Sequence, residues 1–65
     1  MIRNKVEMYD ILIRQANHFI AEYLNAMRKA IEDNKPELAE CYTKLLNYYM
    51  GKRQEYINFR NLYME

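Results

Sequence analysis

The sequence predicts an all-α fold, an antiparallel helical hairpin of two long helices. Apolar residues recur with a 4-3-4-3 heptad spacing on both sides of the chain midpoint. The stretch between the two patterns is short and carries helix-end residues around Pro36. Gly and Pro occur once each among 65 residues, which is too little turn chemistry for an all-β fold. We therefore expect one domain over residues 1–65.

The first helix is expected over about residues 2–32, where the heptad seam runs without interruption. Apolar residues on both flanks broaden this seam beyond what one partner helix can cover, which favours a helical bundle. The a positions are Val6, Ile13, Ile20 and Met27, and the d positions are Ile2, Tyr9, Ala16, Tyr23 and Ala30. The flanks are Leu12, Phe19 and Ala26 on one side, with Leu24 and Ile31 on the other.

The turn is expected at about residues 33–35. Pro36 suits the first position of the second helix, because its missing N–H would be unpaired there and its φ is already set. Pro36 also disfavours the α region for Lys35, which indicates a true break. Asn34 has two candidate roles, as a left-handed residue that ends the first helix or as the N-cap of a box with Glu37. Pro36 favours the first. So short a connection makes the two helices run antiparallel.

The second helix is expected over about residues 36–63 and carries the same heptad seam. Four of the seam residues are tyrosines, so we expect rings packed inside with hydroxyls at the rim, where each can find a partner. The turn places Ala16 opposite Gly51, which predicts a close approach of the two backbones. The alternative is a pocket or a kink at Gly51. The main seam comprises Leu38, Tyr42, Leu45, Tyr49, Lys52, Tyr56, Phe59 and Tyr63.

A second stripe of apolar residues and arginines runs along the second helix beside the main seam. A lone hairpin buries too little to offset the entropy of ordering the chain, so we expect a homodimer that forms a four-helix bundle. If the dimer is built on the main seams, the second stripe stays outside as the partner-binding surface, with guanidinium groups able to bind carboxylates. The alternative is that the second stripe is itself the dimer interface. The second stripe comprises Leu46, Met50, Arg53, Ile57, Arg60 and Met64.

The residue types that catalysis needs are sparse in this chain. His18 is the only histidine and Ser is absent, so no nucleophile–base–orienter set can be assembled. There is no glycine-rich phosphate loop and no metal-ligand cluster. His18 with Glu22 has the spacing of a solvated i,i+4 pair. We expect no enzyme activity, no cofactor and no metal.

Charge and cysteine content bound the location of the protein. No apolar run approaches the roughly 18 residues that a membrane span needs, and no signal-peptide pattern opens the chain. The lone Cys41 suits a reducing compartment, so we expect a cytoplasmic protein. The abundance of Asn, Ile, Lys and Tyr, all with AT-rich codons, favours a low-GC bacterium or one of its phages as the source.

Two functions compete on these observations. The first is a non-enzymatic regulatory or adaptor protein that binds another protein, for example a phage-encoded or bacterial inhibitor. Its basis is the surplus of apolar, tyrosine and methionine side chains, which are enriched at interfaces. The second is an RNA- or DNA-binding hairpin dimer, based on Lys52, Arg53 and Arg60 among tyrosines. The net charge of +1 favours protein binding. A structural subunit of a larger particle is a third reading.

Overall fold

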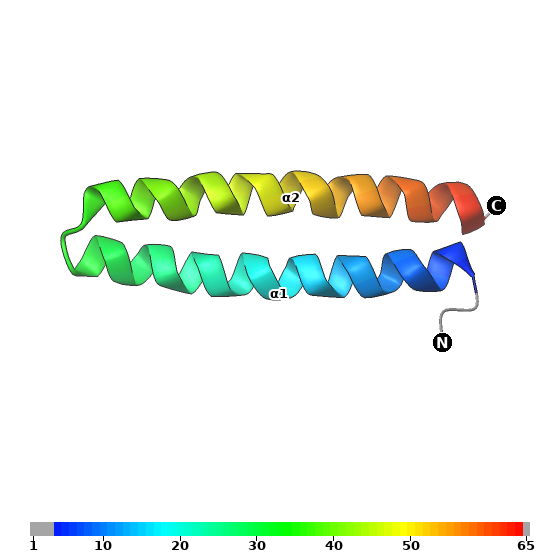
Figure 1. Cartoon of the computed structure of the whole chain (residues 1–65), viewed down its shortest axis with the longest axis horizontal. Coiled ribbons are helices and arrows are strands. Elements are labelled where there is room, and N and C mark those ends of the chain that lie inside the picture. The colour runs from blue at the N-terminus through cyan, green and yellow to red at the C-terminus, as the bar shows by residue number, and fades with distance from the viewer. Residues whose placement is uncertain (1–3, 65) are drawn as a thin grey trace.

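The helical hairpin is confirmed by the structure, a computed structural model that describes residues 4–64. Helix α1 spans Lys5–Glu32 and helix α2 spans Pro36–Met64. The two helices lie side by side and antiparallel, with the turn at one end of the molecule (Figure 1). The Cα atoms extend over 47 × 20 × 11 Å, so the fold is a single layer about one helix thick.

Asn4 sets the start of α1. Its backbone is extended, with φ −155°, and its side-chain Oδ1 accepts a hydrogen bond of 2.8 Å from the Glu7 N–H. This is the geometry of an N-cap, which pairs one of the free N–H groups of the first turn. The heptad pattern alone predicts a start near residue 2, and the cap places it at Lys5. The seam position Ile2 lies outside the described residues.

The turn between the helices is a Schellman motif built on Asn34. This residue has φ 58°, in the left-handed region, so it ends α1 and does not act as the N-cap of α2. The Asn34 N–H donates to the Ile31 carbonyl at 3.0 Å, and the Lys35 N–H donates to the Ala30 carbonyl at 2.8 Å. Pro36 then occupies the first position of α2, as its fixed φ allows.

The face of α1 that meets α2 is the predicted heptad seam. Ala16 and Ala30 are each only 3% exposed, and every other described seam position is half-buried. The small alanine side chains let the helix backbones approach, while the larger seam residues lie between them. The half-buried seam positions are Val6, Tyr9, Ile13, Ile20, Tyr23 and Met27.

The face of α2 that meets α1 includes the tyrosines of the predicted main seam but is rotated toward the second stripe. The most buried residues of α2 are Ala39 and Leu46, while the seam positions Leu38, Leu45 and Phe59 are exposed. The buried line is therefore turned toward the second stripe. The physical reason is that the rings of Tyr42, Tyr49 and Tyr56 pack beside α1, which leaves the positions beyond them exposed. These rings lie to one side of the buried line.

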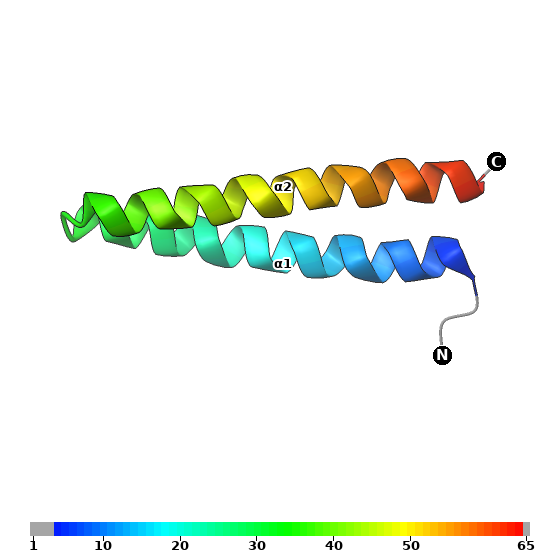
Figure 2. The ribbon, with the colours of Figure 1, turned by 45° about the horizontal axis from the view of Figure 1, so that its top comes forward.

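Gly51 makes no close backbone contact, which corrects the predicted pairing with Ala16. The glycine is exposed, and a Cβ added to it would have no heavy atom within 4 Å. The residues that share a hollow with Ala16 are Tyr49 and Tyr56, so rings and not a second small residue cover it. Helix α2 runs on through Gly51 without interruption, and it crosses α1 at a shallow angle (Figure 2).

We expect Gly51→Ala to stabilise the protein. The new methyl group meets open space, and alanine loses less backbone freedom in a helix than glycine, by about 1 kcal/mol. Thermal unfolding followed by circular dichroism should show a rise in Tm of about 4–8 °C. A fall in Tm would mean that another chain packs closely on Gly51.

Candidate functional site

The second stripe, predicted as the partner-binding surface, divides into an inner and an outer part. Leu46 is 7% exposed and packs against α1, and Ile57 is half-buried. Met50 and Met64, in contrast, are 55% and 58% exposed. The structure thus brings part of the second stripe into the interior of the hairpin and leaves its methionines on the surface.

The two arginines of the second stripe are held by polar residues of α1. Arg53 Nε donates a hydrogen bond of 2.6 Å to Asn17 Oδ1. Arg60 Nε lies 2.7 Å from Asp10 Oδ1. This nitrogen is buried, and its N–H is not aligned on an acceptor of the described residues, so the contact is an ion pair and not a directed hydrogen bond. We call these two contacts the arginine latches.

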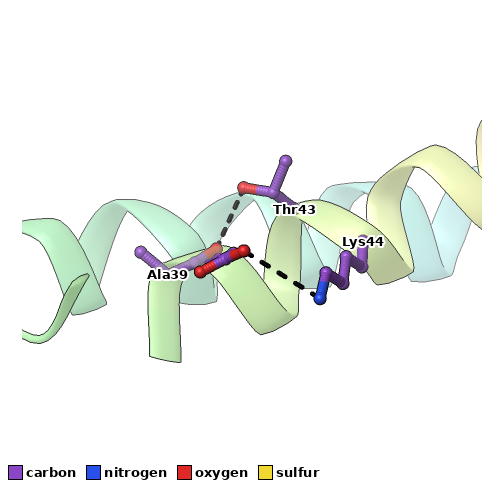
Figure 3. A network of polar contacts seen from close by, with 4 residues as sticks. Ala39, Thr43 and Lys44 are labelled. Carbon is purple, nitrogen blue, oxygen red and sulfur yellow. Dashed lines mark hydrogen bonds and ion pairs between the residues drawn. The ribbon is translucent and has the colours of Figure 1, made fainter. Parts of the chain in front are cut away.

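A third polar contact joins the helices nearer the turn. The Thr43 hydroxyl donates to the Ala39 carbonyl at 2.9 Å, within α2 (Figure 3). The same oxygen lies 3.2 Å from Met27 Sδ on α1. Lys44, in the same turn of α2, instead pairs with Glu40 at 3.9 Å, and both side chains are exposed. The guanidinium groups of Arg53 and Arg60 and the Thr43 hydroxyl therefore all contact residues of α1. Lys44, in contrast, faces solvent.

Aromatic rings line the other side of the gap between the helices. Phe19 stacks on Tyr49 with ring centroids 5.0 Å apart, and Tyr49 lies 5.7 Å from Tyr23. Toward the chain ends, Tyr9 stacks on Phe59 at 5.8 Å and on Tyr63 at 6.0 Å. Offset stacks of this kind contribute about 0.5–1.5 kcal/mol each beyond area burial. We call these rings, with Tyr42 and Tyr56, the aromatic ladder.

The arginine latches and the aromatic ladder lie on opposite sides of the hairpin. Asn17 and Phe19 are two residues apart, so they point about 160° apart around α1 at 3.6 residues per turn. Asp10 is one heptad from Asn17, and Leu12 is one heptad from Phe19, so each side continues along the helix. The hairpin therefore has a polar, latched side and an aromatic side.

The aromatic side carries an exposed apolar column that the sequence interpretation had assigned to the hairpin core. Leu38, Leu45 and Phe59 repeat at heptad positions of α2, beside the tyrosines that stack on α1, and Phe59 also belongs to the aromatic ladder through Tyr9. They are 42%, 38% and 45% exposed. The signal that could have identified them as outer residues is the second apolar line through Ala39 and Leu46, which shares the heptad period and lies closer to α1.

Lys52 occupies the remaining position of this column, and its charge is compensated locally. Its Nζ donates a hydrogen bond of 3.3 Å to Glu55 Oε2. The hydrogen bond and the charge of Glu55 raise the pKa of Lys52 above its ordinary value. The Nζ also lies 5.7 Å from the centre of the Tyr48 ring. Lys52 therefore stays protonated at neutral pH and is paired within its own helix.

Phe19 lies beside two hollows, of which one belongs to the aromatic side. One hollow of about 60 Å³ lies between the helices, and its walls include Leu12, Ala16 and Tyr49. The other, of about 450 Å³, is an open depression on the solvent-facing part of α1, and its walls include Ile11, Arg14 and His18. The partly exposed Phe19 ring and the small hollow next to it are therefore neighbours on the aromatic side.

Over residues 4–64, no three His, Cys, Asp or Glu side chains lie close enough to hold a metal ion. His18 pairs with Glu22 at 3.2 Å, with both side chains largely exposed. Cys41 is a free, exposed thiol. Neither α1 nor α2, as far as they are described, is apolar enough over sufficient length to cross a membrane.

Comparisons with protein-family models, with curated proteins and with solved structures give no match. A helical hairpin is compatible with many unrelated functions. The function must therefore be argued from the surface chemistry of this chain.

We expect Asp10→Asn to lower the free energy of unfolding by about 1 kcal/mol, because it removes the carboxylate charge beside the half-buried Arg60 guanidinium. Urea denaturation at fixed protein concentration measures this difference, which should shrink in about 1 M salt. The matched control is Glu40→Gln, which removes the exposed partner of Lys44 and should change stability by less than about 0.5 kcal/mol. Equal losses in the two variants would contradict a special role for the Arg60 latch.

Proposed function

We propose that this chain is a small non-enzymatic regulatory or adaptor protein of the cytoplasm that acts by binding protein, as a bacterial or phage-encoded inhibitor would. The observation that carries the proposal is the amount of apolar surface left uncovered. Only Ala16, Ala30, Ala39 and Leu46 are buried hydrophobic residues among those described. The exposed large hydrophobic residues are Phe19, Ile31, Leu38, Leu45, Tyr48, Met50, Phe59, Leu62, Tyr63 and Met64.

Exposed apolar surface on this scale supports association with other chains. Large exposed apolar patches on soluble proteins mark interaction sites. Tyrosine and methionine, which make up much of this surface, are among the residue types enriched at protein interfaces. In the proposed functional form two hairpins pair into a four-helix bundle, since two copies supply the second layer that a domain core needs.

The second stripe is the proposed partner surface of the homodimer. Met50 and Met64 supply exposed, flexible apolar anchors, and methionine adapts to irregular partner surfaces. Arg53 and Arg60 are half-buried beside them and hold Asn17 and Asp10. A partner carboxylate would compete with Asn17 and Asp10 for the guanidinium groups. Partner binding would therefore be coupled to the arginine latches.

The homodimer predicts that thermal stability depends on protein concentration. Dilution from about 100 to 1 µM should lower Tm, because dissociation is coupled to unfolding. Sedimentation equilibrium over the same range should show a dimer at the upper end. A monomer throughout, with a constant Tm, would contradict the homodimer.

Met50→Glu tests the partner surface without disturbing the hairpin. The side chain is exposed, so we expect a change in unfolding free energy of less than about 0.5 kcal/mol. Capture of the partner from a lysate of the source organism should fall at least tenfold, because a charge replaces an apolar anchor. The matched control is Leu62→Glu, at another exposed apolar position of α2. Equal capture by both variants and the wild type would remove the second stripe as the site.

Nucleic-acid binding is the second candidate, based on Lys52, Arg53 and Arg60 beside the tyrosines of α2. Each of these cations has a partner within the chain, Glu55, Asn17 and Asp10 respectively, which weighs against free phosphate contacts. A salt titration of any RNA binding separates the two functions. Phosphate neutralisation requires affinity to fall steeply with salt concentration, so a flat slope excludes this candidate.

A further inference from the structure

The exposed area of the hairpin is larger than that of a compact protein of its mass. The chain of 8.0 kDa exposes 5242 Å². A folded monomeric protein of this mass exposes about 4,450 Å², which leaves an excess of about 800 Å². A standard protein interface buries about 800 Å² on each partner. The excess therefore matches what one copy contributes to a stable dimer.

The aromatic side is better suited to this contact than the latched side. On the latched side, Arg53 and Arg60 bridge to α1, and a second copy would have to desolvate both charged groups. On the aromatic side, the outer columns are apolar on both helices except at Lys52, whose charge Glu55 compensates. The outer columns are Leu12, Phe19 and Ala26 on α1, with Leu38, Leu45, Lys52 and Phe59 on α2.

The aromatic side is also complementary to itself, as a two-fold interface requires. Phe19 projects from α1 near the middle of the hairpin, opposite Tyr49 on α2. Of the two hollows beside Phe19, the one walled by Leu12, Ala16 and Tyr49 belongs to the aromatic side. The Phe19 ring of one copy can therefore pack over the mouth of this hollow in the other copy, while the partner's ring does the same. Charge repulsion between two copies is small, since each chain carries a net charge of only +1.

We propose that the aromatic side is the homodimer interface, with the outer columns of two copies forming the second half of a four-helix core. The inference rests on the proposed homodimer and assigns its contact surface. The second stripe then stays outside the dimer. Lys52 lies within the interface with its ammonium group held by Glu55, and its stem packs against apolar neighbours.

Three variants test this assignment by sedimentation equilibrium of the full chain, with circular dichroism to check helix content. Leu45→Glu places an unpaired charge in the interface and should raise the dimer Kd at least about 100-fold. Lys52→Leu completes the apolar column and should lower the Kd about tenfold. A lower Kd cannot arise from unfolding, so Lys52→Leu still tests the assignment if Leu45→Glu loses its helix. Leu62→Glu, outside both columns, should leave the Kd within about threefold.

The outcomes separate the contact surface from the homodimer itself. A wild-type dimer that Leu45→Glu dissociates and Lys52→Leu tightens supports the assignment. A wild-type dimer that is unchanged by both, but dissociated by Met50→Glu, overturns the assignment and places the interface on the second stripe while the homodimer stands. A wild-type chain that is monomeric at about 100 µM overturns the homodimer and the assignment together.

Discussion

The hydrogen bonds that close the turn at Asn34 set the register for every contact between the helices. The Lys35 N–H reaches back to Ala30, and Asn34 takes the left-handed conformation that lets the chain reverse at once. Because the reversal is this tight, α2 has little freedom to slide along α1. Phe19 then meets Tyr49 at mid-length, and Asp10 meets Arg60 far from the turn. A different turn would separate all of these pairs.

A layer one helix thick can cover each side chain from only one direction, and this limits how deep the core can be. The alanines at the line of closest approach are buried, while most larger residues are half-buried. Tyrosine suits such positions because its ring packs and its hydroxyl stays at the rim. At the open end, for example, the Tyr63 hydroxyl accepts a hydrogen bond of 3.2 Å from Lys5. The abundance of tyrosine thus follows from the shape of the hairpin.

The division of polar and aromatic residues between the two sides links the fold to the proposed binding functions. Charged groups that bridge the helices stabilise the hairpin and are costly to desolvate, so they disfavour a permanent interface on their side. Stacked aromatic rings carry no charge to desolvate, and burial of their outer edges stabilises an interface. In the proposed assembly the aromatic side therefore forms the permanent dimer interface. The latched side, with its methionines, binds a transient partner.

Local sequence determined the two helices, their antiparallel direction and the site of the turn. These features depend on heptad spacing, on the fixed φ of Pro36 and on the tolerance of Asn34 for a left-handed backbone, all of which act within a few residues. Only the tertiary structure decided which face of α2 meets α1. Two neighbouring stripes of α2 share one period, and α1 packs between them, with Leu46 buried on one side and the rings of Tyr49 and Tyr56 on the other. The reason is that the flat rings fill the space beside Ala16. The latches likewise depend on the packed helices, because Asp10 and Asn17 lie far from their arginines along the chain.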